Sequence, residues 1–265
     1  MKPYILPPHS FKISAPWFAI VVTGIFWSLL SPLSHAVTPV DVLVVPYRQV
    51  SVSFPVGGIV EELSVREGAR VEQGDFLGAL EHEEERLDAR RFEKVLEKRA
   101  SDHEATASLF LERMTSAEEA LDKRIEMEIA EIQYRRALAT VERRKLYSPL
   151  RGLVVARERE PGEWVDPGTV VLEVVDIDQV YAQLMLSAEE SSSVRMGQEI
   201  PLVFAAINGD PRFQGTVDFI DPRIDAASGL LKVRVLVDNA DHRLPPGLSG
   251  FAWLSAGEHE GGSDD

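Results

Sequence analysis

The feature that most constrains the fold is a glycine-punctuated segment that occurs twice at a constant spacing. Each copy consists of short β-branched runs between glycines, and glycine readily adopts the positive φ angles that tight turns require. The matching positions lie 94 residues apart: Gly58 with Gly152, Gly68 with Gly162, Val71 with Val165, Gly74 with Gly168, and Leu77 with Val171. A gap-free repeat of this kind predicts two halves of one small β-sandwich, residues 37–81 and 148–178, split by an insertion.

The insertion, residues 82–147, contains neither glycine nor proline and is rich in Glu, Arg, Lys, Ala and Leu. This composition predicts helix. Ser116 followed by Glu119 forms a capping-box pattern, which predicts a break within residues 114–119. Two helices of about 30 residues would each reach about 45 Å. Because both ends join the same sandwich, the helices must run antiparallel as a hairpin.

The seam between the two helices is predicted from apolar residues at steps of three, four and seven. The interleaved charges are expected to be solvated, and the exposed tip is where a partner would bind. The predicted seam residues are Leu87, Phe92, Leu96 and Phe110 on the first helix and Leu121, Ile125, Ile129, Ile132, Ala139 and Leu146 on the second.

Both ends of the chain have a distinct composition. Residues 1–36 carry Lys2 and Lys12, an apolar run and a Ser34-His35-Ala36 end, the pattern of a secretory signal peptide. The alternative is an uncleaved membrane anchor, since the run is near the roughly 18 residues that a span needs. Five short strands predict a small β-barrel over residues 179–256. Residues 257–265 are polar and acidic, and we expect a disordered tail.

Composition excludes several kinds of chemistry. A formal net charge of −15 argues against nucleic acid binding, which needs a basic surface. The absence of cysteine excludes disulfides, a thiol nucleophile and a cysteine zinc site. The six histidines lack the paired spacing of a zinc site, and the aspartates near the barrel strands miss the calcium-loop pattern. We therefore predict no enzyme activity, no metal and no cofactor.

In this arrangement, the motifs resemble those of the periplasmic adaptor (membrane fusion) proteins of tripartite efflux pumps, the HlyD-like family. The resemblance covers roughly residues 40–256. It implies a mainly β fold, in which a lipoyl-like β-sandwich is split by an antiparallel coiled-coil hairpin and followed by a small β-barrel. The matching positions are Gly58-Ile59-Val60, Glu67-Gly68, Val71, Gly74-Asp75, Ser148-Pro149, Gly152, Val154, Phe213, Gly215, Val217 and Pro246-Gly247.

The resemblance also implies partners. It implies an inner-membrane transporter, most like the proton-driven RND type, a TolC-type outer-membrane channel, and further copies of the chain in a ring. It places the protein in the periplasm of a Gram-negative bacterium, where it would take part in the export of small molecules. The sequence after the barrel is too short for the membrane-proximal β-domain of larger relatives.

At the hairpin tip, the resemblance implies that Ala117, Leu121 and Asp122 dock the channel. Leu121-Asp122 matches the end of the family's tip pattern, but Thr106, Phe110 and Ala117 replace its Arg, Leu and Ser. The glycines Gly58, Gly68, Gly74, Gly152, Gly162 and Gly168 would shape the sandwich, and Gly215, Pro246 and Gly247 the barrel.

Three alternatives remain at this level. The adaptor could serve an ABC-type exporter, or the architecture could be a periplasmic ligand-binding or sensory module whose hairpin dimerises. A lipoylated or biotinylated carrier domain would need a lysine on the turn between the halves, where the hairpin stands. Lys145 is the nearest candidate, and we interpret it instead as a cation at a helix C-terminus.

Overall fold

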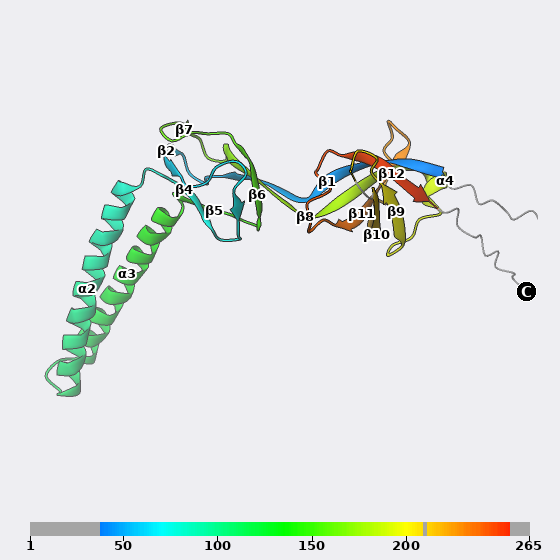
Figure 1. Cartoon of the computed structure of the whole chain (residues 1–265). Coiled ribbons are helices and arrows are strands. Elements are labelled where there is room, and N and C mark those ends of the chain that lie inside the picture. The colour runs from blue at the N-terminus through cyan, green and yellow to red at the C-terminus, as the bar shows by residue number, and fades with distance from the viewer. Residues whose placement is uncertain (1–37, 209–210, 255–265) are drawn as a thin grey trace, which may run out of the picture.

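The computed structural model describes residues 38–208 and 211–254. A helical hairpin, a β-sandwich and a β-barrel follow one another, with the hairpin and barrel at opposite ends and the hairpin inclined to the line through the other two modules (Figure 1). The fold class predicted from sequence is therefore confirmed. The expected signal peptide and acidic tail lie outside these residues. Within the described part, no helix is long and apolar enough to cross a membrane.

Along the chain, strands of the sandwich come before and after the hairpin, and most strands of the barrel follow. The helices are α2 (Glu83–Leu111), α3 (Ala117–Glu142) and α4 (Ala188–Ser191). The strands up to the end of the sandwich are β1 (Thr38–Ser53), β2 (Gly58–Leu63), β3 (Arg70–Val71), β4 (Phe76–Leu80), β5 (Lys145–Tyr147), β6 (Gly152–Arg157), β7 (Trp164–Val165) and β8 (Val170–Ser187). The barrel adds β9 (Glu199–Val203), β10 (Arg212–Ile220), β11 (Leu230–Asp238) and β12 (Ser249–Leu254).

The 94-residue repeat reappears as pseudo-twofold symmetry in the sandwich. One sheet has the order β1-β8-β6-β3 and the other β5-β4-β2-β7, and the repeat maps each strand of the first onto its counterpart in the second. The two halves also hydrogen-bond reciprocally: the amide of Gly68 donates to the carbonyl of Val154, and that of Gly162 to Val60, both at 2.8 Å. The halves thus complete each other's sheets.

Two kinds of glycine occur at the repeated positions. Gly68, Gly74, Gly162 and Gly168 have φ angles of 81°, 89°, 92° and 81°, in the left-handed region that favours glycine. Gly58 and Gly152 are not in this class. A β-carbon at Gly152 would lie 2.2 Å from the carbonyl oxygen of Val175, so close strand packing requires glycine there.

The barrel closes through a strand that the sequence did not assign to it. Its six strands run in the order β1-β12-β9-β10-β11-β8, and β1 also pairs with β8. We expected residues 37–81 to belong to the first sandwich half. In the structure, Val40, Val42 and Val44 lie in the barrel core, and Val52 lies in the sandwich core. β1 and β8 are thus shared by both modules (Figure 1).

The helical hairpin is shorter than its predicted range of 82–147. α3 ends at Glu142, and residues 145–147 form β5, which pairs with β4. Leu146, predicted in the seam, is buried in the sandwich core instead. The predicted break is present: Ser116 caps α3 by accepting a hydrogen bond from the amide of Glu119. The Glu119 carboxylate accepts from the hydroxyl of Thr115, so the reciprocal half of the capping box is absent.

Candidate functional site

The seam of the hairpin consists of small residues. Its buried cluster is Ala89, Ala137 and Val141, with Phe92 packed against it, and Ala130 is also buried. Half-buried polar residues continue the seam toward the tip, where Arg99 donates to Glu126 across the helices at 2.8 Å. Alanine lets the two backbones approach closely, so the larger apolar side chains of α3 are not needed between them.

The predicted seam of α3 is therefore wrong for its largest residues. Leu121, Ile125, Ile129 and Ile132 are between 44% and 67% exposed. They are spaced by four, four and three residues, so they form one row along the helix. Counted at about 100° per residue, the middle of the row lies about 145° around the helix from Ala130 and about 125° from Ala137, on the side away from the seam. We call these four residues the outer stripe.

The hairpin tip is closed by a backbone motif that the sequence did not reveal. Arg113 has a φ angle of 61°, and the amides of Arg113 and Met114 donate to the carbonyls of Phe110 and Leu109. This pattern is a Schellman motif, which usually has glycine at its left-handed position. Without a glycine, no local signal identified Arg113. The turn leaves Leu111 83% exposed.

The predicted docking residues lie at the start of α3, beside this turn. Ala117 is the first residue of the helix, and its side chain is exposed. Leu121 is 54% exposed and begins the outer stripe, and the neighbouring Asp122 is exposed too. All three side chains are exposed. The hairpin tip, where α3 begins, is the end of the molecule farthest from the barrel (Figure 1).

The root of the hairpin is fixed to the sandwich by ion pairs. Arg144 reaches Glu85 of α2 at 2.5 Å and donates to the carbonyl of Glu81 at 3.1 Å. Lys145 donates to Glu142 at 2.7 Å. This hydrogen bond lowers the pKa of Glu142 and raises that of Lys145. Lys145, the nearest candidate for a lipoyl or biotin attachment site, is thus held in an ion pair on β5, next to the buried Leu146.

The predicted barrel residues occupy close contacts between strands. A β-carbon at Gly215 would lie 2.6 Å from the side chain of Val235, so β10 and β11 pack tightly there. Gly247 has a φ angle of 92°, and its amide donates to the carbonyl of Val44 on β1 at 2.8 Å. Pro246 is exposed in this turn. The Pro246-Gly247 turn thus attaches β1 to the barrel.

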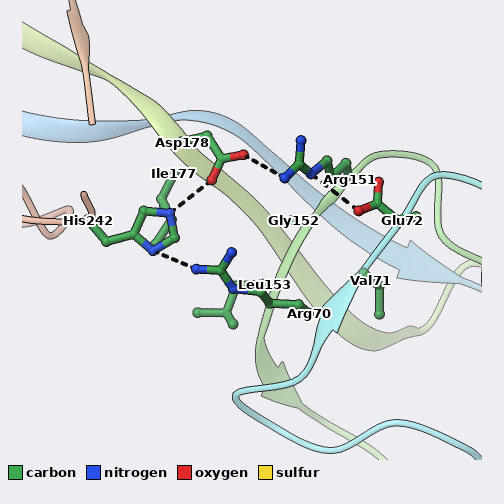
Figure 2. A pocket seen from close by; sticks show the side chains of 9 residues that line it. All are labelled: Arg70, Val71, Glu72, Arg151, Gly152, Leu153, Ile177, Asp178 and His242. Atoms are coloured by element: carbon green, nitrogen blue, oxygen red, sulfur yellow. Dashed lines mark hydrogen bonds and ion pairs between the residues drawn. The ribbon is translucent and has the colours of Figure 1, made fainter. Parts of the chain in front are cut away.

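A polar cluster that sequence reasoning missed joins the sandwich to the barrel. His242, in the loop between β11 and β12, lies between Asp178 of β8 and Arg70 of β3 (Figure 2). Arg151 contacts Asp178 at 3.6 Å and Glu72 at 3.3 Å. These five residues, here called the junction cluster, surround a small cavity of about 90 Å³. His242 shows no sequence signal because its partners are 64 and 172 residues away.

The electrostatics of the junction cluster favour an ionised Asp178. The hydrogen bond from His242 lowers the pKa of Asp178, and the positive charge of Arg151 lowers it further. Asp178 is thus a carboxylate near neutral pH. Among the described residues, no group of three or more His, Cys, Asp or Glu side chains has an arrangement that could hold a metal ion.

Two family models match consecutive parts of the chain. Residues 48–176 match the CzcB-like barrel-sandwich hybrid domain, and residues 179–258 match the CusB-like β-barrel domain. The boundary between the two matches falls at the junction cluster, between Asp176 and Gln179.

Several curated proteins are similar to this chain. An uncharacterised protein of Haemophilus influenzae is 24% identical over 78% of this chain and 54% of its own length. The efflux pump periplasmic linker BepD of Brucella suis is 24% identical over 76% of this chain and 58% of its own length. The chain thus spans little more than half of these relatives.

A solved structure has the same fold. It is a MacA–MexA chimeric protein that contains the α-hairpin domain of Pseudomonas aeruginosa MexA. The match has a TM-score of 0.75 at 17% identity, and it covers 83% of this chain and 79% of the other. At this identity the similarity concerns the fold alone.

Proposed function

Because this chain belongs to the periplasmic adaptor (membrane fusion) family, we propose that it links an inner-membrane RND-type transporter to an outer-membrane channel for the export of small molecules. Members of the family are adaptors rather than enzymes. Efflux and a periplasmic position are stated in the name of the Brucella relative. We extend both properties, a role in efflux and a periplasmic position, to this chain.

The observation that carries the proposal is the exposed apolar end of the hairpin. Leu121 begins the outer stripe next to the tip, and Leu111 projects from the turn. Exposed apolar side chains gathered on one projecting element are typical of protein-binding surfaces. The hairpin extends away from the barrel (Figure 1). In our proposal the tip docks the channel through Ala117, Leu121 and Asp122.

The barrel and the sandwich would make the remaining contacts of the adaptor. In our proposal the barrel contacts the transporter, and the sandwiches of adjacent copies pack into a ring. The turn glycines then act indirectly, because they give the sandwich the shape in which it packs. An excess of acidic over basic residues, 43 against 28, is compatible with these protein partners and unfavourable for nucleic acid.

The first experiment is an export assay with Leu121→Asp in cells that lack the wild-type chain. We expect export to be lost while circular dichroism stays unchanged, because a charge on an exposed apolar contact opposes docking without disturbing the core. Leu87→Asp is the matched control, since Leu87 is 57% exposed and lies at the other end of the hairpin. Wild-type export by Leu121→Asp would contradict docking at the tip.

Crosslinking would identify the partners. The chain has no cysteine, so single cysteines are unique labels. Ala117→Cys probes the tip. For the barrel, Gln214→Cys is suitable because Gln214 is exposed, whereas its neighbour Gly215 has no room for a side chain. We expect channel adducts from position 117 and transporter adducts from position 214. Adducts with an ABC-type transporter, or adducts only between copies of this chain at both positions, would contradict a link between an RND-type transporter and a channel.

A further inference from the structure

The connection between sandwich and barrel consists of two strands. β1 and β8 run antiparallel through both modules, and their pairing is interrupted by a register shift between Pro46 and Arg48. Opposite this shift, the paired residues jump from Val180 to Asp176. A two-stranded ribbon with a bulge bends more easily than a full sheet. The angle between the modules therefore depends on side-chain contacts across the junction.

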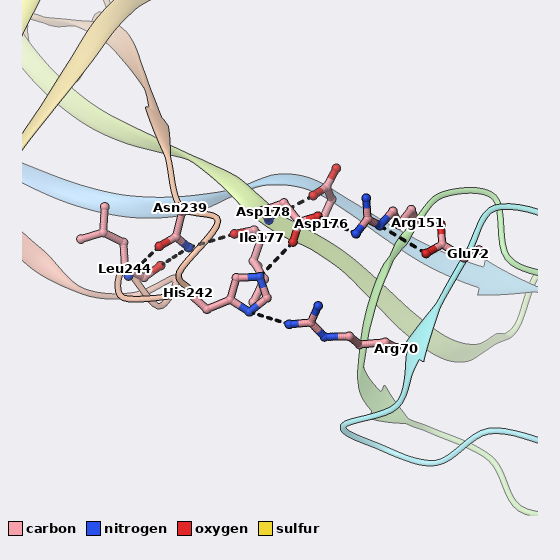
Figure 3. Close-up of polar contacts among 9 residues, drawn as sticks. All are labelled: Arg70, Glu72, Arg151, Asp176, Ile177, Asp178, Asn239, His242 and Leu244. Atoms are coloured by element: carbon pink, nitrogen blue, oxygen red, sulfur yellow. Dashed lines mark hydrogen bonds and ion pairs between the residues drawn. The ribbon is translucent and has the colours of Figure 1, made fainter.

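The barrel loop that carries His242 is held firmly against β8. The buried side chain of Asn239 donates to the carbonyl of Ile177 at 2.8 Å, and its side-chain oxygen accepts from the amide of Leu244 at 2.8 Å (Figure 3). The amide of Asn239 donates to the carbonyl of Asp178. Asn239 thus makes the loop a rigid platform next to the bulge.

His242 adopts a left-handed backbone conformation on this platform, with a φ angle of 53°. Such a conformation is uncommon for a residue other than glycine and is maintained here by the surrounding loop. The amide of His242 donates to the carbonyl of Asn239 at 2.8 Å. The imidazole ring is thereby aimed out of the barrel loop, toward the sandwich (Figure 2).

The two contacts of the ring define its protonation state. Nε2 lies 2.9 Å from the Asp178 carboxylate, which only accepts, so Nε2 carries a hydrogen. Nδ1 lies 3.1 Å from Nη2 of Arg70, and a guanidinium only donates, so Nδ1 must present its lone pair. Only the neutral ring protonated at Nε2 satisfies both contacts. A second proton, on Nδ1, would place two donors and two positive charges against each other.

The charged groups around the ring come from every element that faces it. Arg70 of β3 opposes a positive imidazolium, and Asp178 of β8 favours it. Arg151, which precedes β6, forms ion pairs with the same Asp178 carboxylate and with Glu72. On the loop itself, Asp241 and Arg243 flank His242 with opposite charges. After protonation the Asp178 contact persists, and the Arg70 contact is the one that is lost.

We propose that His242 is a pH-sensitive latch that holds the sandwich at a fixed angle to the barrel through Arg70 and releases it when the imidazole is protonated. The latch is intramolecular and does not depend on the proposed function. Release leaves His242 attached to Asp178 and the loop attached by Asn239. The sandwich and hairpin then pivot together about the bulge in β1 and β8.

The test measures the angle between the modules in the purified full chain. Spin labels on Ser64→Cys in the sandwich and Gln214→Cys in the barrel, both exposed, report one distance distribution. We expect a single narrow peak at about pH 8 and a broad distribution at about pH 5, the range over which imidazole changes its charge. A narrow peak of unchanged position at both pH values would overturn the proposal.

Three variants identify the groups responsible. Arg70→Ala should give the broad distribution at both pH values, and the control Arg66→Ala, an exposed arginine four residues away, should behave as wild type. His242→Asn keeps an acceptor near the Nδ1 position, tolerates the left-handed backbone and does not titrate. It should stay narrow at both pH values, and broadening in acid would assign the transition to another group.

A measurement on the wild-type chain keeps the proposal testable if a variant fails to fold. Nitrogen chemical shifts of the ring distinguish the two neutral tautomers. We expect the Nε2-protonated form at about pH 8 and a doubly protonated ring at about pH 5. The Nδ1-protonated tautomer at the higher pH would overturn the latch, because that form cannot accept a hydrogen bond from Arg70.

Discussion

Gly58 and Gly152 occupy equivalent places in the repeat but have different surroundings. A β-carbon at Gly152 would lie 2.2 Å from a backbone oxygen, that of Val175. At Gly58 the nearest atom would be Nη1 of Arg144 at 2.9 Å, the far end of a flexible side chain. A side chain end can move aside, whereas a paired strand cannot do so without losing hydrogen bonds.

We therefore predict that Gly152→Ala destabilises the chain more than Gly58→Ala does. Overpacking against fixed backbone costs about 1–3 kcal/mol, and we expect Gly152→Ala in the upper part of this range. Gly58→Ala should cost less than about 1 kcal/mol. Urea unfolding of the two variants and wild type measures the difference. Equal losses of stability would show that the pseudo-symmetric environments are energetically equivalent.

Asp221 makes the stability of the barrel depend on acid. Its carboxylate accepts three hydrogen bonds from Arg223, from the amide and from two guanidinium nitrogens, each at 3.0 Å. The side-chain hydrogen bond from Arg223 is the main reason why the pKa of Asp221 falls to about 2. Because the folded pKa is below the unfolded value of about 3.9, the stabilisation is complete above about pH 5 and is lost as the pH falls toward about 2.

The corresponding prediction is that Asp221→Asn lowers stability near neutral pH and has little effect near pH 2. Asparagine keeps the shape of the side chain but cannot attract the Arg223 guanidinium. The midpoint of urea unfolding, measured against pH for both proteins, should show two curves that converge in acid. Parallel curves over the whole range would exclude this carboxylate as the titrating group.

At the scale of the element, the hairpin keeps its packed side chains and its large exposed apolar side chains on different faces. Its seam is formed by small side chains such as Ala137, which is 9% exposed. The large apolar residues of α3 lie on the outer stripe, where Ile129 is 51% exposed. Apolar side chains exposed in this way contribute little to the folding of a single copy. They remain available for a partner.

Placing the same charge on the two faces of α3 tests this division. We predict that Ala137→Asp destabilises the hairpin by about 1–3 kcal/mol, because it buries an unpaired carboxylate in the seam. Ile129→Asp should stay within about 0.5 kcal/mol of wild type, because that position is solvated. Thermal unfolding followed by the helical circular dichroism signal gives both values. A larger loss from Ile129→Asp would mean that the outer stripe is packed within the chain.

At the scale of the whole molecule, the three modules have three separate cores. The barrel and sandwich cores each contain many Val and Leu residues, and the two modules share β1 and β8. The buried cluster of the hairpin consists of Ala89, Ala137 and Val141. Regions with few buried apolar contacts open at lower free energy than well-packed sheets.

Hydrogen exchange should therefore distinguish the modules. We predict that amides of the hairpin near residues 95–125 exchange faster than those of β8 and β11, because the hairpin seam buries much less apolar surface. Mass spectrometry of peptic fragments resolves these segments. The same protection in the hairpin and the barrel strands would indicate one cooperative unit, and the seam would then have to be stronger than its composition suggests.

The sequence by itself determined the modules and their order. The 94-residue repeat is a periodic signal that can be read along the sequence, and the turn glycines and the Ser116 cap are local signals that depend on neighbouring residues. The composition of the insertion identified the helices of the hairpin, because a segment without glycine or proline that is rich in helix-forming residues has few alternatives to helix. These parts of the fold class were therefore predictable from residue type and spacing.

Only the tertiary structure decided which surfaces meet. β1 is the sixth barrel strand because it pairs with β12. That pairing was not predictable from local sequence, since β12 lies near the other end of the chain. The hairpin seam runs through Ala130 and Ala137. Which face of α3 turns toward α2 depends on how the surfaces of both helices fit together, and the positions of the large apolar residues alone do not specify it. His242 meets Arg70 across 172 residues, and no local pattern encodes such a contact. Long-range pairing is set by the packing of the complete chain, which short-range signals do not contain.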